Sequence, residues 1–154
     1  MSPTPEEPIS VLLSDVTRLF WRRLEAALKG AGLDFTAGEA RTLVNAARSP
    51  GLRQAALAER MRIEPMTLVG FLDRLEARGL VERSADPADR RAKLVRTTAA
   101  AAEMVERVLS VSAIVKAEVS AGLTPAEIEV LRDLLQRIRA NLDILQDGPG
   151  ACAA

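Results

Sequence analysis

The sequence contains no histidine, no tyrosine and a single cysteine among its 154 residues. Without histidine the chain lacks the commonest general base and the commonest metal ligand. The one cysteine, Cys152, excludes a disulfide within the chain. A Gly-rich phosphate loop and a nucleophile elbow are also missing. These absences predict a protein that is not an enzyme and that holds neither a metal ion nor a cofactor.

Long hydrophobic runs are missing as well. No stretch reaches the roughly 18 apolar residues that a membrane-spanning helix needs. At the N-terminus, Pro3, Pro5, Glu6 and Glu7 stand where a signal peptide would have its basic and apolar regions. We therefore expect a cytoplasmic protein with no membrane partner. Its length and its 48% hydrophobic content suffice for one core, with or without a dimerisation extension.

Neither sign of charge dominates, because 21 basic residues face 21 acidic ones. The distribution is uneven, however. Residues 83–98 hold five basic residues against two acidic ones, and residues 99–154 hold five against eight. A local basic segment within a neutral chain is compatible with contact to nucleic acid, where the placement of charge matters more than its sum.

The central stretch has the pattern of a helix-turn-helix. Residues 53–61 favour a short helix, and a polar break follows at 62–64. Pro65 suits the first turn of a second helix that reaches about Arg78, with Leu68, Leu72 and Leu75 on one face as its core side. Gly79 is positioned as a left-handed cap. Two short helices joined by a tight turn define the motif.

A β-hairpin is expected directly after this motif. Residues 80–83 and 93–97 look like strands, and the polar residues 84–92, with Pro87, look like the loop between them. The pair Leu52-Arg53 is a candidate for a short strand against this hairpin. Helix, helix and hairpin together make a winged helix.

Four helices surround this region. Periodic apolar residues predict helices over 9–29, 36–48, 99–121 and from 125 to about 147. Thr36 with Glu39, and Thr124 with Glu127, form two predicted capping boxes, and Thr98 is expected to cap the helix after the hairpin. The fold class is therefore mainly α with a small β-hairpin wing. Residues 1–8 are expected to be a flexible arm, and residues 148–154 a disordered tail.

The sequence resembles the MarR family of bacterial regulators, most closely its SlyA-like branch. The resemblance covers Ile9 to Leu145. Its specific part is the wing segment 86–93 with the flanking strands, and it also includes the segments 57–59, 67–69, 72–76 and 79–83. It implies a winged helix-turn-helix over 36–98 and dimerisation helices over 9–35 and 99–147. It thus implies a homodimer that binds a double-stranded DNA operator.

The second helix of such a motif lies in the major groove with its N-terminal residues nearest the bases. The residues expected at base edges are Pro65, Met66, Thr67, Val69 and Gly70, and Arg74 is better placed for a phosphate. Met66 and Val69 offer apolar contact to thymine methyl groups. Relatives of the SlyA-like branch often have an arginine where this chain has Gly70, which shifts specificity from guanine readout toward DNA shape and the wing.

In the wing, Asp89 and Arg91 match the family's Asp-x-Arg pattern. The resemblance implies that Arg91 enters the minor groove and that Asp89 orients it; a narrow groove attracts such a side chain. The alternative is an exposed ion pair on a solvated hairpin. Arg90, Lys93 and Arg96 are either phosphate contacts or solubilising charges.

The resemblance also implies a small-molecule pocket between the dimerisation helices and the DNA-binding lobe. Trp21, with Arg18 or Arg22, could stack on and neutralise a small aromatic or phenolic anion. The alternative is that Trp21 is a packing residue at a helix junction. The resulting hypothesis is a ligand-responsive repressor that binds a pseudo-palindromic operator; its rival is a winged-helix module for protein–protein contact without DNA binding.

Overall fold

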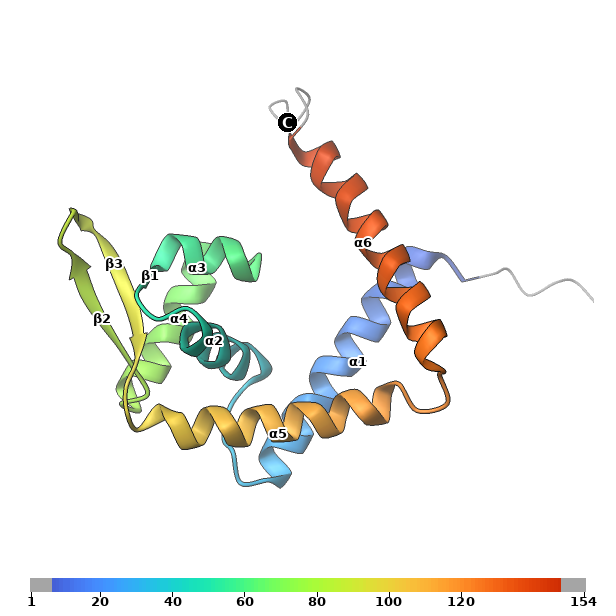
Figure 1. The fold of residues 1–154 in the computed structure, drawn as a ribbon, viewed down its shortest axis with the longest axis horizontal. Coiled ribbons are helices and arrows are strands. Elements are labelled where there is room, and N and C mark those ends of the chain that lie inside the picture. Colours follow the sequence, from blue (N-terminus) through green and yellow to red (C-terminus); the bar gives the residue numbers. More distant parts are fainter. Residues whose placement is uncertain (1–6, 148–154) are drawn as a thin grey trace, which may run out of the picture. The chain divides into compact units, whose positions relative to one another are not determined.

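The computed structural model describes residues 7–147 (Figure 1). The chain divides into two compact units, Met1–Lys116 and Ala117–Ala154. Most of the expected flexible arm, the expected disordered tail and Cys152 lie outside the described residues. The elements in chain order are α1 (Ile9–Gly30), α2 (Ala37–Arg48), β1 (Leu52–Arg53), α3 (Gln54–Met61), α4 (Pro65–Ala77), β2 (Val81–Asp86), β3 (Asp89–Thr97), α5 (Ala101–Val119) and α6 (Pro125–Asp147).

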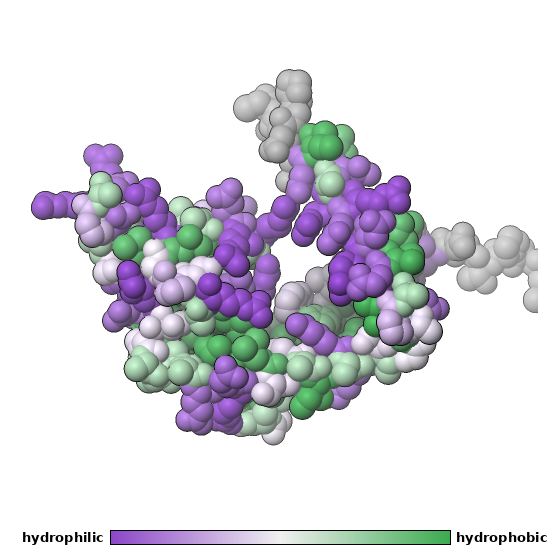
Figure 2. Space-filling model, viewed as in Figure 1, coloured by the Kyte–Doolittle hydropathy of each residue, from purple (hydrophilic) through white to green (hydrophobic). Residues whose placement is uncertain are grey.

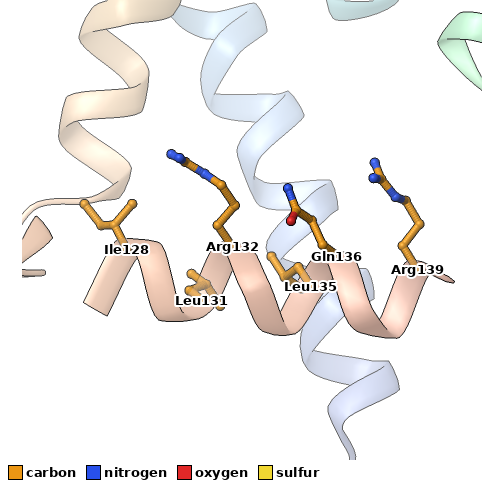
Figure 3. Close-up of a pocket in the computed structure, with 6 residues that line it drawn as sticks. All are labelled: Ile128, Leu131, Arg132, Leu135, Gln136 and Arg139. Atoms are coloured by element: carbon orange, nitrogen blue, oxygen red, sulfur yellow. The ribbon is translucent and has the colours of Figure 1, made fainter. Parts of the chain in front are cut away.

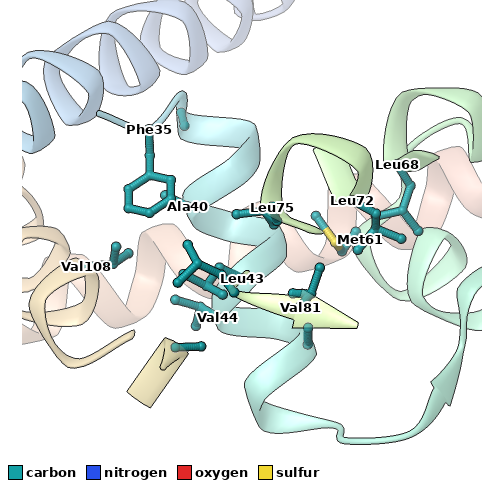
Figure 4. Close-up of a cluster of buried hydrophobic side chains, with 14 of the residues drawn as sticks. Phe35, Ala40, Leu43, Val44, Met61, Leu68, Leu72, Leu75, Val81 and Val108 are labelled. Carbon is teal, nitrogen blue, oxygen red and sulfur yellow. The ribbon is translucent and has the colours of Figure 1, made fainter. Parts of the chain in front are cut away.

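The first unit is built around one apolar cluster (Figure 4). Leu68, Leu72 and Leu75 of α4 are completely buried in it, as the spacing of the leucines predicts. Burial of each such side chain stabilises the fold by about 1.5–3 kcal/mol. The remaining members come from α1, α2, α3, the sheet, the part of α5 that belongs to this unit, and the loop residues Leu33, Phe35 and Leu80. The cluster therefore fixes the orientation of α4 relative to α2 and α3.

The three strands form an antiparallel sheet in the order β1-β3-β2. Leu52 pairs with Val95 and Arg53 with Leu94, which confirms the short strand expected ahead of α3. The hairpin strands are longer than the sequence predicts, because β2 extends to Asp86 and β3 begins at Asp89. Ala85 pairs with Lys93 and Asp86 with Asp89, and the register shift between these two pairs leaves residues 90–92 of β3 without a partner on β2. The connection between the strands is thus reduced to Pro87 and Ala88, and the pairing is regular up to Ala85 and Lys93.

Two left-handed residues close the helices of the helix-turn-helix. Gly79 (φ +69°) ends α4, where its amide donates to the Glu76 carbonyl and the Leu80 amide to the Leu75 carbonyl. The left-handed cap that the sequence predicts is thus confirmed, and its two hydrogen bonds are those of a Schellman motif. Arg62 (φ +51°) ends α3 in the same way, although left-handed backbone strains any residue other than glycine.

The two capping boxes are confirmed, and the third expected cap is wrong. Thr36 and Glu39 exchange both hydrogen bonds at the start of α2, and Thr124 and Glu127 do so before α6. The helix after the wing begins at Ala101, two residues later than expected. The Thr98 hydroxyl instead donates to the Gly79 carbonyl at 2.6 Å, so a tertiary contact takes the place of the cap.

The terminal helices leave much apolar surface uncovered in the single chain. On α1 the exposed side chains include Val16 and Leu19, and on α6 they include Leu131, Leu134 and Leu142. Hydrophobic atoms are visible at the surface of α6 in Figure 2. No helix among residues 7–147 is long and apolar enough to cross a membrane.

Candidate nucleic-acid interface

The N-terminal turn of α4 is the most exposed part of the helix-turn-helix. Pro65 occupies the first turn, and no side chain caps the helix. Pro65, Met66 and Thr67 are exposed, with 78% of Met66 accessible, while Val69 and Gly70 are half-buried. The buried leucines of α4 face the opposite way. The fold therefore places all five predicted base-contact residues in the first two turns of α4, and the first three are exposed to solvent.

Gly70 is not required by packing. A Cβ added at this position would meet only the Arg74 side chain, at an ordinary 3.7 Å. Glycine in a helix interior costs about 0.5–1 kcal/mol relative to alanine, because it loses more backbone freedom on folding. The helix therefore carries this cost of glycine although no contact within the first unit requires glycine at position 70.

Arg74 has an internal partner. Its Nε atom donates to the Glu39 carboxylate, and its guanidinium lies 5.3 Å from the centre of the Phe71 ring. Glu39 is buried and also accepts from the Thr36 amide at 2.9 Å. Burial raises the pKa of Glu39, but these two donors outweigh it, so its pKa lies below the ordinary value. Arg74 thus ties α4 to the start of α2, while half of its side chain remains exposed.

Asp86 organises the wing, a role that sequence reasoning did not assign to it. One carboxylate oxygen accepts from the Ala88 amide at 2.9 Å and closes the tip. The other accepts from Arg53 at 2.7 Å and ties the wing to the strand that precedes α3. The hydrogen bond from Ala88, aided by Arg53, lowers the pKa of Asp86. The aspartate therefore stays charged and holds the hairpin against the helix-turn-helix.

The predicted wing residues lie together beyond this anchor. The Asp89 carboxylate accepts from the backbone amide of Arg91 at 3.0 Å, so it fixes the chain at Arg91. Arg90, Arg91 and Lys93 are exposed. Within residues 7–147 neither Arg90 nor Arg91 forms an ion pair. A groove of about 380 Å³ between the wing and the start of α3 is lined by Arg53, Gln54, Arg91 and Lys93, among others.

Other motif arginines are used inside the fold. Arg83 of β2 donates to Asp73 at 2.6 Å and also pairs with Glu76, both on α4. Its hydrogen bond lowers the pKa of Glu76. Arg53, Arg74 and Arg83 are therefore matched to carboxylates. Within the wing, by contrast, Arg90 and Arg91 have no carboxylate partner among residues 7–147, and the surface at the wing tip in Figure 2 is strongly hydrophilic.

Trp21 lies at two cavities of the first unit. One, of about 280 Å³, lies between α1, α2 and α5; the other, of about 270 Å³, reaches α4. Trp21 is half-buried and makes an edge contact with Phe20 at 5.0 Å between ring centres. Small-molecule sites occupy about 300–1,000 Å³, so either cavity is near the lower limit for a ligand.

The basic residues beside Trp21 are not those that the sequence suggests. Arg18 is exposed and pairs with Asp15, and Arg22 is exposed; neither lines a Trp21 cavity. Arg41, Arg48 and Lys116, from α2 and α5, line the first cavity instead. They lie 20 or more residues from Trp21 in the sequence, so no local spacing marks them. Among residues 7–147, no group of three or more His, Cys, Asp or Glu side chains could hold a metal ion.

Comparisons with known proteins agree with this geometry. Residues 35–93 match the MarR family. The chain is similar to the transcriptional regulator PA3341 (31% identity, 88% of this chain and 98% of that chain, TM-score 0.77). It is also similar to CouR from Rhodococcus jostii RHA1 bound to p-coumaroyl-CoA (27%, 89% and 95%, 0.76). Wild-type MarR from E. coli in its apo form is a third match (26%, 88% and 98%, 0.71).

The chain therefore belongs to the MarR family and has the winged helix-turn-helix fold of its transcriptional regulators. These matches include several regulators of the family and do not separate the SlyA-like branch from the rest.

Proposed function

We propose that this protein is a homodimeric regulator that binds a pseudo-palindromic duplex operator and acts as a repressor released by a small anionic effector. It acts by binding rather than by catalysis. The observation that carries the proposal is the combination, within one unit, of an exposed α4 N-terminus and a wing whose tip presents arginines without a carboxylate partner among residues 7–147.

The wing supplies the electrostatic part of the interaction. Arg90 and Arg91 are exposed without a carboxylate partner among the described residues, whereas Asp86 and Asp89 accept from backbone amides and so shape the tip. An arginine whose backbone is held by the Asp89 carboxylate suits a narrow minor groove, whose negative potential is enhanced. Lys93, beside it in the groove with Arg53, suits a phosphate.

The α4 turn supplies the base contacts. Met66, exposed at 78%, offers an apolar surface to a thymine methyl group, and Thr67 offers a hydroxyl. Gly70 leaves no side chain between the helix and the DNA, which permits close approach but removes guanine readout. Sequence preference is therefore expected to depend on thymine contacts and on the shape of the minor groove.

Uncovered apolar surface on the terminal helices supports the homodimer. One face of α6 forms a shallow groove of about 450 Å³ in which Ile128, Leu131 and Leu135 lie beside Arg132, Gln136 and Arg139 (Figure 3). Soluble single chains rarely leave such faces exposed. A two-fold dimer covers them with a second copy and also places two α4 helices for the two halves of an operator.

The effector is proposed to be an aromatic anion bound in the Trp21 cavity. CouR, a structural match, is bound to p-coumaroyl-CoA, an aromatic acyl thioester. In this chain the cavity between α1, α2 and α5 combines two aromatic rings with three basic side chains. Membership of the SlyA-like branch stays a prediction based on the wing segment 86–93.

The deciding experiment uses duplexes from the intergenic DNA beside the neighbouring genes. The dimer should bind one of them in preference to unrelated DNA. With ~6–10 phosphates contacted, its affinity should fall about 10³–10⁵-fold between about 50 and 200 mM salt. A flat salt response, or equal binding to every duplex, would favour the rival protein-contact module.

A further inference from the structure

Arg41 stands between the Trp21 cavities and the turn of the helix-turn-helix. It is a half-buried residue of α2 that lines both cavities, as Trp21 does. Its guanidinium carbon lies 6.0 Å from the centre of the Trp21 ring, and its Nη2 atom donates to the Met61 carbonyl. One side chain therefore connects the wall of a cavity to the end of α3.

The Met61 carbonyl needs this donor. Met61 is the last residue of α3, where carbonyl groups have no partner within the helix. The next residue, Arg62, adopts the strained left-handed conformation, and the Ile63 amide reaches back to the Ala58 carbonyl at 3.1 Å. The turn that leads from α3 into α4 is therefore strained, and Arg41 donates the hydrogen bond to the first carbonyl group of this turn, that of Met61.

An anion in the first cavity would compete for the same guanidinium. Arg41, Arg48 and Lys116 line this cavity, and no acidic residue does. A carboxylate adds a negative charge and a second acceptor oxygen that the Met61 carbonyl lacks, so it can bind the guanidinium through two parallel hydrogen bonds. A ring stacked near Phe20 and Trp21 would bring its carboxylate toward Arg41. A two-point contact with that carboxylate draws the guanidinium into the cavity and away from the Met61 carbonyl.

The second cavity provides room for a response. It is lined by Ile63 of the turn and by Thr67 and Phe71 of α4, in addition to Trp21 and Arg41. Unfilled space beside a strained turn permits the turn and the first residues of α4 to shift once Arg41 withdraws. Thr67 is also one of the residues proposed to face DNA.

We propose that Arg41 is the residue that couples effector binding to operator release. An aromatic carboxylate bound against Trp21 takes the Arg41 guanidinium, the Met61 carbonyl loses its donor, and the relaxed turn moves α4 out of the orientation that fits the operator. This inference rests on the proposed regulation of DNA binding by an anionic effector.

The test measures the operator dissociation constant of the full-length dimer with and without saturating salicylate, used as the probe. The ratio of the two constants is the coupling factor, expected between about 5 and 150 for the parent protein. Arg41→Met should reduce it to about 1, while Trp21 fluorescence still reports salicylate binding through Arg48 and Lys116.

Arg48→Met is the matched control. It should weaken salicylate binding yet keep the parent's factor at saturation, because Arg48 does not bond the turn. Uncharged salicylamide should have little effect on the parent protein.

Two outcomes overturn the inference and leave DNA binding standing. One is an Arg41→Met variant that keeps the parent's coupling factor. The other is a parent protein that binds its operator but shows neither Trp21 quenching nor a shift in affinity with millimolar salicylate. A parent protein that binds no operator contradicts the proposed function itself, and the inference with it.

Hydrogen exchange of the parent protein decides the question if Arg41→Met does not fold. Salicylate should accelerate exchange of the Arg62 and Ile63 amides, which close α3 beside Met61. Exchange at the matched Gly79 and Leu80 amides, which end α4 in the same way without Arg41, should change less. Unchanged exchange at Arg62 and Ile63 in the salicylate complex overturns the inference.

Discussion

Replacement of Glu39 by glutamine tests whether the α2–α4 contact is built as described. The carboxylate accepts from two donors, the Thr36 amide and the Arg74 guanidinium. Glu39→Gln keeps the size of the side chain but leaves one oxygen for two donors, and turns an amide NH₂ toward one of them. The variant therefore removes one acceptor without opening a cavity.

The magnitude follows from the environment of each partner. A hydrogen bond to a charged group contributes about 1.5–3 kcal/mol, and an exposed ion pair about 0–1 kcal/mol. Glu39 is buried at 5% exposure, whereas the Arg74 side chain is 54% exposed. We therefore expect a loss between these limits, of about 1–2 kcal/mol in the free energy of unfolding at neutral pH.

Urea unfolding followed by circular dichroism measures this loss, at one fixed protomer concentration because dimer stability depends on it. Glu127→Gln is the matched control. It alters the same Thr-x-x-Glu box at the start of α6, where both residues are exposed and no arginine joins. The control should lose less stability than Glu39→Gln. Equal losses would refute the reasoning, because burial and Arg74 would then contribute nothing.

Three further predictions concern packing, pH and assembly. Gly38→Ala should destabilise the protein by about 1–3 kcal/mol, because the new methyl group falls on the Phe71 ring, and Phe71→Leu should recover part of the loss in the same urea assay. The pKa of Glu39 is lowered in the folded protein, so its contribution to the free energy of unfolding is fully present above the ordinary glutamate pKa and is lost as the pH falls through the pKa of the folded state. The melting temperature should therefore fall less between pH 7 and pH 3 for Glu39→Gln than for the parent protein. Leu142→Asp, at an apolar site of α6 that is 54% exposed in the single chain, should yield monomers in analytical ultracentrifugation and weaken operator binding; an unchanged dimer would exclude this face from the interface.

Local features of the fold could be predicted from the sequence. The two capping boxes, the leucine face of α4 and the Gly79 cap each depend on residues within one or two turns, and the structure confirms all of them. The wing was predicted too short. Its outer residues are mostly polar or small and exposed, so no hydrophobic alternation marks them. The pairing of Ala85 with Lys93 and of Asp86 with Asp89, together with the Asp86 turn, nevertheless extends the strands to the tip.

The contacts that shape the candidate sites could not be predicted in this way. Arg74 meets Glu39 across 35 residues, and Arg41 meets Met61 across 20. From the sequence, Arg41 is an ordinary polar position of an amphipathic helix and Arg74 is a candidate phosphate contact. Only the packing of α2 against α3 and α4 shows what they contact within the fold. Local spacing predicts that the arginines beside Trp21 come from its own helix, whereas the basic residues that line the cavity come from α2 and α5.

The most direct test of the account is the operator affinity of Arg91→Ala, measured with its melting temperature. We expect the variant to fold normally, since Arg91 is exposed and makes no ion pair among the described residues. It should lose on the order of 1–3 kcal/mol of binding for each minor-groove contact, and the two-fold axis repeats that contact. Lys93→Ala should weaken all duplexes alike and lower the salt slope by about one unit per site. An Arg91→Ala dimer that folds normally and binds the operator as tightly as the parent protein would contradict the assignment of the wing to DNA.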